Sequence, residues 1–109
     1  MRAKPGQVLE IATPRGFAYA QYASRHPEYG DIIRVLPGLF AKRPDDLSKL
    51  ALEHAYFAFY PAGAALARRF VVPVTIEPIP AGLDKPRRIR RPGATTKEGR
   101  LLTWIVIRW

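Results

Sequence analysis

A tight turn between two alternating segments is the feature of this chain that most limits its fold. The segment QVLEIA (residues 7–12) alternates between two faces, and only the face of Leu9 and Ile11 is wholly apolar. FAYAQYAS (17–24) alternates in the same way. Between them, Thr13-Pro14-Arg15-Gly16 places proline where a turn needs a fixed φ and glycine where it needs a left-handed exit. The sequence therefore predicts an antiparallel hairpin.

A third strand is predicted at 31–36, with Ile33 and Val35 on one face and Ile32, Arg34 and Leu36 on the other. The link RHPEYG (25–30) contains a proline and a glycine, which interrupt regular structure. Three consecutive antiparallel strands would make a meander.

The middle of the chain predicts one clear helix. Residues 45–54 place Asp45 as the N-cap and Asp46 in the first turn, where the helix dipole favours an anion. AYFAFYP (55–61) then predicts an aromatic strand, and 62–70 allows a further turn or two of helix.

The last third of the chain is rich in proline. FVVPVTIE (70–77) resembles a strand, but Pro73 lacks an N–H and is expected at an edge or a bulge. Residues 77–92 contain four prolines and predict an irregular arm, continued by GATTKEG (93–99). RLLTWIVIRW (100–109) predicts a final strand that belongs to the sheet.

These elements predict one α+β domain covering residues 1–109, without internal repeats. We expect a strongly bent antiparallel sheet of about five or six strands. One helix would be inserted midway, and a partly open SH3-like barrel would suit this order of elements.

The net charge of +9 is unevenly distributed. Residues 1–80 hold ten Lys/Arg against seven Asp/Glu (+3), whereas residues 81–109 hold eight against two (+6). Such an excess suits a polyanionic partner, and it also suits a solvated surface loop. The absence of cysteine excludes disulfides and thiolate metal sites. Because no apolar run has the length of a signal peptide or a membrane span, we expect a cytoplasmic protein without membrane contact.

The residues give little support to catalysis. Ser24 lies two positions from His26, but consecutive residues of one loop seldom form a triad, and His26 more simply fixes the turn before Pro27. His54, on the apolar stripe of the predicted helix, is far from His26, and two histidines do not make a metal site. We therefore expect no enzyme, no catalytic residues, no metal and no cofactor.

Short structural motifs over most of the chain carry a resemblance to a known family. The first segment is KPGQVLEIATPRGFAYAQYASRHPEYGDIIRVLPG (4–38). In it, Pro5-Gly6 precedes the first predicted strand, Gly16-Phe17-Ala18-Tyr19 begins the second, and Ile33-Arg34-Val35-Leu36 lies in the third. Two later segments, YFAFYP (56–61) and PVTIEPIP (73–80), also carry the resemblance. With these motifs the chain resembles the immunity protein 26 family of bacterial polymorphic-toxin systems. The resemblance implies a small cytoplasmic protein that neutralises a cognate toxin by stoichiometric binding, without a cofactor.

The leading hypothesis is accordingly a non-catalytic protein-binding domain. Its partner surface would combine tyrosines and arginines, the usual anchors of protein interfaces, around the second and third strands. The predicted partner-binding residues are Tyr22, Arg25, His26, Tyr29 and Arg34.

Nucleic-acid binding is the alternative hypothesis. The prolines of KPRRIRRPG would hold a basic arm extended, and Tyr19, Tyr22 or Tyr29, if exposed, could stack on bases. The predicted nucleic-acid contacts are Lys85, Arg87, Arg88, Arg90 and Arg91. Packing of Phe17, Phe57, Phe59 and Trp104 in the core explains the other aromatic residues.

Overall fold

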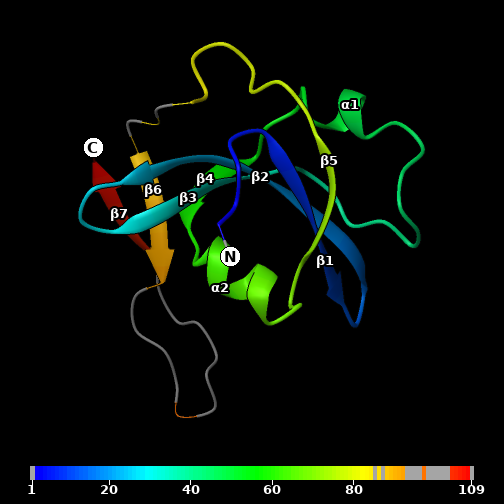
Figure 1. Cartoon of the computed structure of the whole chain (residues 1–109), viewed down its shortest axis with the longest axis horizontal. Coiled ribbons are helices and arrows are strands. Elements are labelled where there is room, and N and C mark those ends of the chain that lie inside the picture. Colours follow the sequence, from blue (N-terminus) through cyan, green and yellow to red (C-terminus); the bar gives the residue numbers. More distant parts are fainter. Residues whose placement is uncertain (1, 85, 87, 93–96, 98–103, 109) are drawn as a thin grey trace.

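The computed structural model of the chain describes residues 2–84, 86, 88–92, 97 and 104–108 (Figure 1). These residues form a small, sheet-rich domain with seven strands and two short helices. The strands are β1 (Gln7–Thr13), β2 (Gly16–His26), β3 (Gly30–Val35), β4 (Tyr56–Phe59), β5 (Val72–Ile76), β6 (Arg88–Pro92) and β7 (Trp104–Arg108). The helices are α1 (Leu47–Leu50) and α2 (Ala62–Ala67).

The predicted meander is confirmed. β1 and β2 pair antiparallel from Val8↔Gln21 to Thr13↔Gly16, so the turn lies where the proline and glycine placed it. β2 then pairs with β3, with a register shift between Tyr22 and Ser24. Beyond this bulge β2 continues to His26, so the link is shorter than the predicted segment 25–30.

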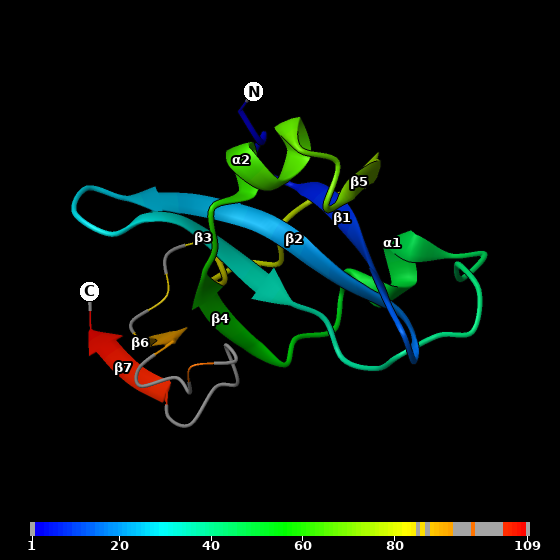
Figure 2. The ribbon, with the colours of Figure 1, turned by 90° about the horizontal axis from the view of Figure 1, so that it is seen from below.

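The sheet has the strand order β5-β1-β2-β3-β4-β6-β7, with β4–β6 as its parallel pair (Figure 2). β5 is an edge strand with a register shift beside Pro73, as the proline predicted. The sheet has seven strands rather than five or six and is not closed, because β5 and β7 are its two ends. The SH3-like barrel stays a prediction.

The prediction of an irregular arm over residues 77–92 is wrong for its last five residues. Residues 88–92 form β6, a strand held between β4 and β7. Arg88 and Arg90 are exposed while Ile89 between them is 1% exposed, which is the two-residue alternation of a half-buried strand. The flanking prolines concealed this alternation in the sequence.

The prediction of a helix over residues 45–54 with Asp45 as its N-cap is also wrong, both in the length of the helix and in the capping residue. α1 makes a single turn, and the cap is Asp46 rather than Asp45, since Asp46 Oδ1 accepts from Lys49 N at 3.0 Å. His54 lies beyond this helix. α2 is a second helix where the sequence allowed a turn or two. In the described part of the chain, no helix has both the length and the apolar character needed to cross a membrane.

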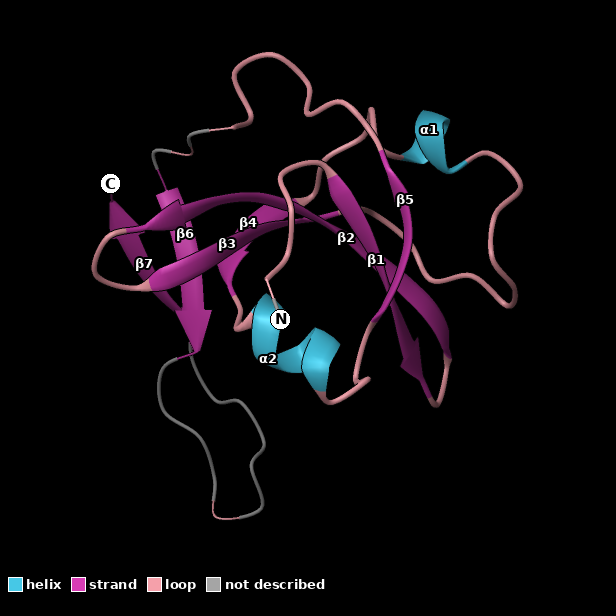
Figure 3. Ribbon diagram, in the orientation of Figure 1, coloured by secondary structure: helices cyan, strands magenta, loops and turns pink. Residues whose placement is uncertain are grey.

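Apolar residues are buried on both faces of the meander, although only one face of β1 is wholly apolar in sequence. On one face, α2 packs over a cluster of the sheet that includes Leu9, Tyr22 and Ile33. On the other, Tyr19 packs in a cluster with Leu50 of α1. Figure 3 shows the two helices in separate places on the sheet. The side chains that face these two layers are therefore structural, whatever their polarity.

The predicted core aromatics are partly enclosed. Phe17 packs against the second cluster, and Phe57 and Phe59 are half-buried. The side chain of Trp104 lies outside the described residues.

Candidate functional site

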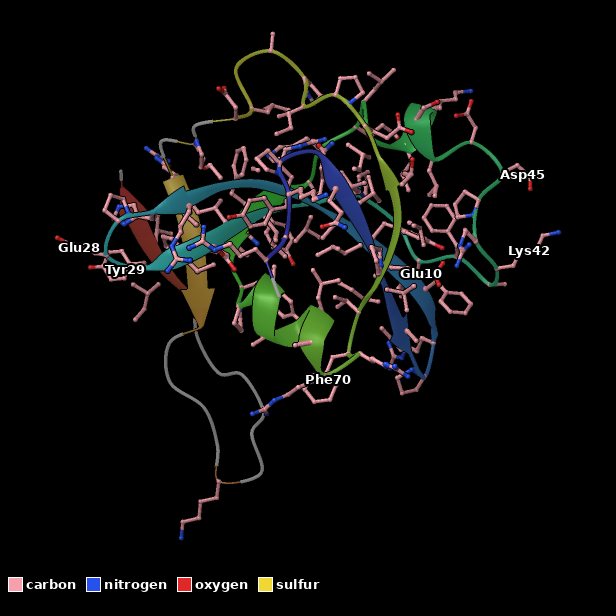
Figure 4. All side chains as sticks on the ribbon, viewed as in Figure 1. Glu10, Glu28, Tyr29, Lys42, Asp45 and Phe70 are labelled. Carbon is pink, nitrogen blue, oxygen red and sulfur yellow. The ribbon has the colours of Figure 1, made fainter. Side chains whose placement is uncertain are left out.

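The tip of the β2–β3 hairpin brings together three of the five predicted partner-binding residues. Arg25, His26 and Tyr29 lie there beside Phe59 and Tyr60 at the end of β4, and we call these five residues the hairpin-tip surface. The Arg25 side chain is 67% exposed and Tyr29 is 43% exposed. Arg25, Tyr29, Phe59 and Tyr60 also line a shallow groove of about 290 Å³. Figure 4 shows Glu28 and Tyr29 at this extremity of the molecule.

Ring contacts hold the aromatic side chains of this surface in place. The ring centroids are 5.1 Å apart for His26–Tyr29, 5.3 Å for Tyr29–Phe59 and 5.8 Å for His26–Phe59. His26 Nδ1 accepts hydrogen bonds from the backbone N–H groups of Glu28, at 3.1 Å, and Tyr29, at 3.3 Å. His26 therefore holds a turn, as predicted, but this turn spans residues 27–29 and begins at Pro27 rather than before it.

Ser24 is not hydrogen-bonded to His26. Ser24 Oγ is buried and has no hydrogen-bond partner among the described residues. A nucleophilic serine needs a base within hydrogen-bond reach, and this geometry does not supply one. In the described part of the chain, no group of three or more His, Asp or Glu side chains could hold a metal ion.

The prediction that Tyr22 is an exposed contact residue is wrong. Tyr22 is 7% exposed, and its hydroxyl donates to Asp31 Oδ1 at 3.1 Å. Asp31 Oδ1 also lies 3.8 Å from Arg25 Nη1, and Asp31 Oδ2 accepts from Gly63 N of α2 at 3.4 Å. Asp31 therefore connects β2, β3 and α2. These residues line part of a wider hollow of about 680 Å³ that Arg2 also borders.

The prediction that Arg34 contacts a partner is also wrong, because Arg34 is 0% exposed. Its Nη2 donates to Gln21 Oε1 and Ala51 O, both at 2.6 Å, and its Nη1 donates to Glu53 O at 2.9 Å. The guanidinium therefore joins the sheet to the segment after α1. Burial lowers the Arg34 pKa from its ordinary value. A signal for this was in the sequence, since Arg34 shares its strand face with apolar Ile32 and Leu36.

Gln21 extends this contact into a buried polar network that sequence analysis missed. Its Nε2 donates to Gly6 O at 3.2 Å and to Glu77 O at 2.8 Å, which ties the start of β1 to the end of β5. At the other end of the network, Arg34 Nη1 lies 3.4 Å from His54 Nδ1. Burial and the nearby Arg34 charge lower the pKa of His54. The network explains why polar side chains occupy the interior here.

A second polar cluster fixes the long loop before α1. Glu10 Oε2 accepts from Tyr19 OH at 2.7 Å and from Arg43 Nε at 2.8 Å. The hydrogen bond from Arg43 holds the pKa of Glu10 below its ordinary value. Burial, with the hydrogen bond to Glu10, raises the pKa of Tyr19 to about 12. Tyr19 is 1% exposed, so it is not a base-stacking residue.

The Tyr19 hydroxyl should stay protonated well above the pH at which an ordinary tyrosine ionises. We expect Tyr19→Phe to remove a late step, near pH 12, from the ultraviolet absorbance titration of tyrosinate. The pKa is raised in the folded state, so the stabilisation is complete below about pH 10 and is lost between about pH 10 and 12. Circular dichroism at each pH controls for unfolding. A step near pH 12 that persists with undiminished amplitude in Tyr19→Phe would contradict this assignment.

The basic cluster lies beside the aromatic strand. β4 and β6 pair in parallel at Ala58↔Arg90, and the Arg90 guanidinium lies 4.5 Å from the centroid of the Tyr56 ring. A groove of about 300 Å³ lies here, bordered by Tyr56, Arg88, Arg90 and Val106. Two further predicted contacts, Lys85 and Arg87, lie outside the described residues, as does the Arg91 side chain.

Comparison of the chain with protein-family models, curated proteins and solved structures finds no match. The function must therefore be argued from the surfaces of the molecule. Two of them combine exposed arginine with aromatic or apolar side chains, namely the hairpin-tip surface and the β6–β7 end of the sheet.

Proposed function

We propose that this chain is a non-catalytic protein-binding domain that neutralises a toxin-like partner by stoichiometric binding through its hairpin-tip surface. The observation that carries the proposal is the joint exposure of Arg25 and Tyr29 on a packed aromatic base. Tyrosine and arginine are the side chains that most often anchor protein interfaces. The toxin-neutralising part of the proposal comes from the resemblance of short sequence motifs, residues 4–38 among them, to the immunity protein 26 family, to which no family model assigns the chain.

The hairpin tip is suited to binding because it is already ordered. Two hydrogen bonds to His26 close the turn, and the rings of His26, Tyr29 and Phe59 contact one another. A side chain held in its bound position loses less conformational entropy on association. The surface thus presents Tyr29 at low entropic cost.

The charge of the chain favours an acidic partner. A net charge of +9 attracts a surface of opposite sign and opposes a cationic one. A toxin with an acidic docking surface therefore fits better than one whose docking surface is basic.

We expect Tyr29→Ala and Arg25→Ala each to weaken binding of the partner by about tenfold, as for interface anchors. The partner is isolated from the native host by pull-down, and its affinity and stoichiometry are measured by calorimetry. Lys42→Ala is the control, since Lys42 is exposed at the opposite end of the molecule (Figure 4). A partner that binds both hairpin variants with full affinity would exclude this surface.

Nucleic-acid binding stays the second proposal, and one observation favours it. The pairing of β4 with β6 places basic side chains next to the aromatic strand, which the sequence had left apart. However, two of the tyrosines expected to stack on bases, Tyr19 and Tyr22, are buried. The available contacts are mainly electrostatic, so binding to DNA or RNA would be unspecific and would fall steeply with salt.

A further inference from the structure

The two edges of the open sheet differ in how they are protected. β5 carries Pro73, which cannot donate a hydrogen bond, and its pairing with β1 is irregular. β7 pairs with β6 in an unbroken register from Arg88↔Arg108 to Pro92↔Trp104. Among the described strands, β7 is the last of the sheet on this side. Proline and bulges protect sheet edges from further pairing, and β7 has neither.

The structure describes two side chains of β7, and both are exposed and apolar. Ile105 is 38% exposed and Val106 is 57% exposed. Successive residues of a strand point to opposite faces, so at these two positions the edge is apolar on both sides. An open edge of this kind is a template for an added strand, in which backbone hydrogen bonds supply affinity and side chains supply selectivity.

The charge beside this edge indicates what it would accept. Arg88 and Arg90 on the adjacent strand are exposed, and no carboxylate forms an ion pair with either among the described residues. Residues 81–109 carry eight basic against two acidic residues. A second copy of the chain would bring like charges together, whereas an acidic segment would neutralise them.

We propose that the outer edge of β7 binds an extended, acidic segment of a partner protein as an additional strand. The backbone of the segment would pair with β7, and its carboxylates would lie near Arg88 and Arg90, in the groove that Val106 also borders. This site consists of residues other than those of the hairpin-tip surface, so either proposal can fail without the other.

The test uses synthetic peptides of about eight residues, the upper length of ordinary strands. One alternates glutamate with valine and threonine, a second replaces glutamate by lysine, and a third keeps glutamate but has an N-methyl group on every backbone nitrogen, so that neither of its edges can donate to a strand. Binding is followed by the fluorescence of Trp104 and Trp109, the two tryptophans of the chain, and by calorimetry. The variants are Arg88→Glu/Arg90→Glu and the control Arg15→Glu/Lys42→Glu, which changes the net charge equally at other exposed positions.

We expect the glutamate peptide to bind the wild-type chain and the control variant equally. It should bind Arg88→Glu/Arg90→Glu about tenfold more weakly, because two surface ion pairs are lost. The lysine and N-methylated peptides should not bind, and Tyr29→Ala should bind the glutamate peptide as the wild type does. Circular dichroism shows whether each variant keeps its fold, while the N-methylated peptide tests the wild-type chain itself.

Several results would overturn the proposal. Equal binding of the N-methylated peptide would mean attraction by charge without strand pairing. Sedimentation of the chain as a dimer, without peptide binding, would make a second copy the occupant of the edge. A DNA oligonucleotide that binds through Arg88 and Arg90 while no peptide binds would assign these residues to nucleic acid. Absence of binding to all probes would remove the site.

Discussion

Arg34→Met should lower the free energy of unfolding by about 3 kcal/mol, because the substitution leaves three hydrogen-bond acceptors without a donor. These acceptors are Gln21 Oε1, Ala51 O and Glu53 O. Each unsatisfied buried acceptor costs about 1–3 kcal/mol, and relief from burying the guanidinium offsets part of that sum. The apolar stem is kept, so lost packing contributes little. The loss is measured by urea denaturation followed by circular dichroism.

Arg25→Met is the matched control on the neighbouring strand. Arg25 is exposed, and its charge lies 3.8 Å from Asp31, so its loss should cost less than about 1 kcal/mol. Arg34→Lys keeps the charge but cannot reach all three acceptors, and its stability should fall between those of the wild type and Arg34→Met. If Arg34→Met were no less stable than Arg25→Met, the polar network would not hold α1 to the sheet.

Features set by neighbouring residues were predictable from the sequence. The first hairpin follows from period-2 alternation on both sides of a proline–glycine turn, and β5 lies at an edge because Pro73 cannot join a central ladder. Such signals lie within a few residues. They need no knowledge of the rest of the fold.

Features set by distant contacts were not predictable. The parallel pairing of β4 with β6 joins segments about 30 residues apart, and nothing local specifies its register. The prolines near β6 also favoured an irregular arm over the short alternation around Ile89. Long-range pairing therefore decided where the basic residues lie.

The candidate site was predicted in part for a related reason. Arg25, His26 and Tyr29 follow each other closely in one hairpin, so sequence proximity was enough to predict that they lie together. Arg34 was assigned to the surface because it is charged, but its hydrogen bonds come from segments far along the chain. Charge alone does not distinguish an interface arginine from one that satisfies buried carbonyl groups.

Gly6→Ala should lower the free energy of unfolding by about 3 kcal/mol or more, through backbone strain and a steric clash. Gly6 has φ +86°, and a Cβ added there would lie 2.5 Å from Glu77 O. That oxygen cannot easily move, since it accepts from Gln21 Nε2, while Glu77 N donates to Gly6 O at 2.9 Å. Gly6 N also donates to Tyr22 O. Urea denaturation measures the loss.

Gly30→Ala separates the two causes. Gly30 has φ +91°, close to that of Gly6, but a Cβ added there would meet no atom within 4 Å. Its substitution should therefore lower the free energy of unfolding only through the strain of a left-handed backbone, which is about 1–2 kcal/mol. The excess loss in Gly6→Ala then measures the junction of Gly6 with Glu77, on which the Gln21–Arg34 network depends. Equal losses in the two variants would mean that this junction opens without cost and that the network is not anchored at β5.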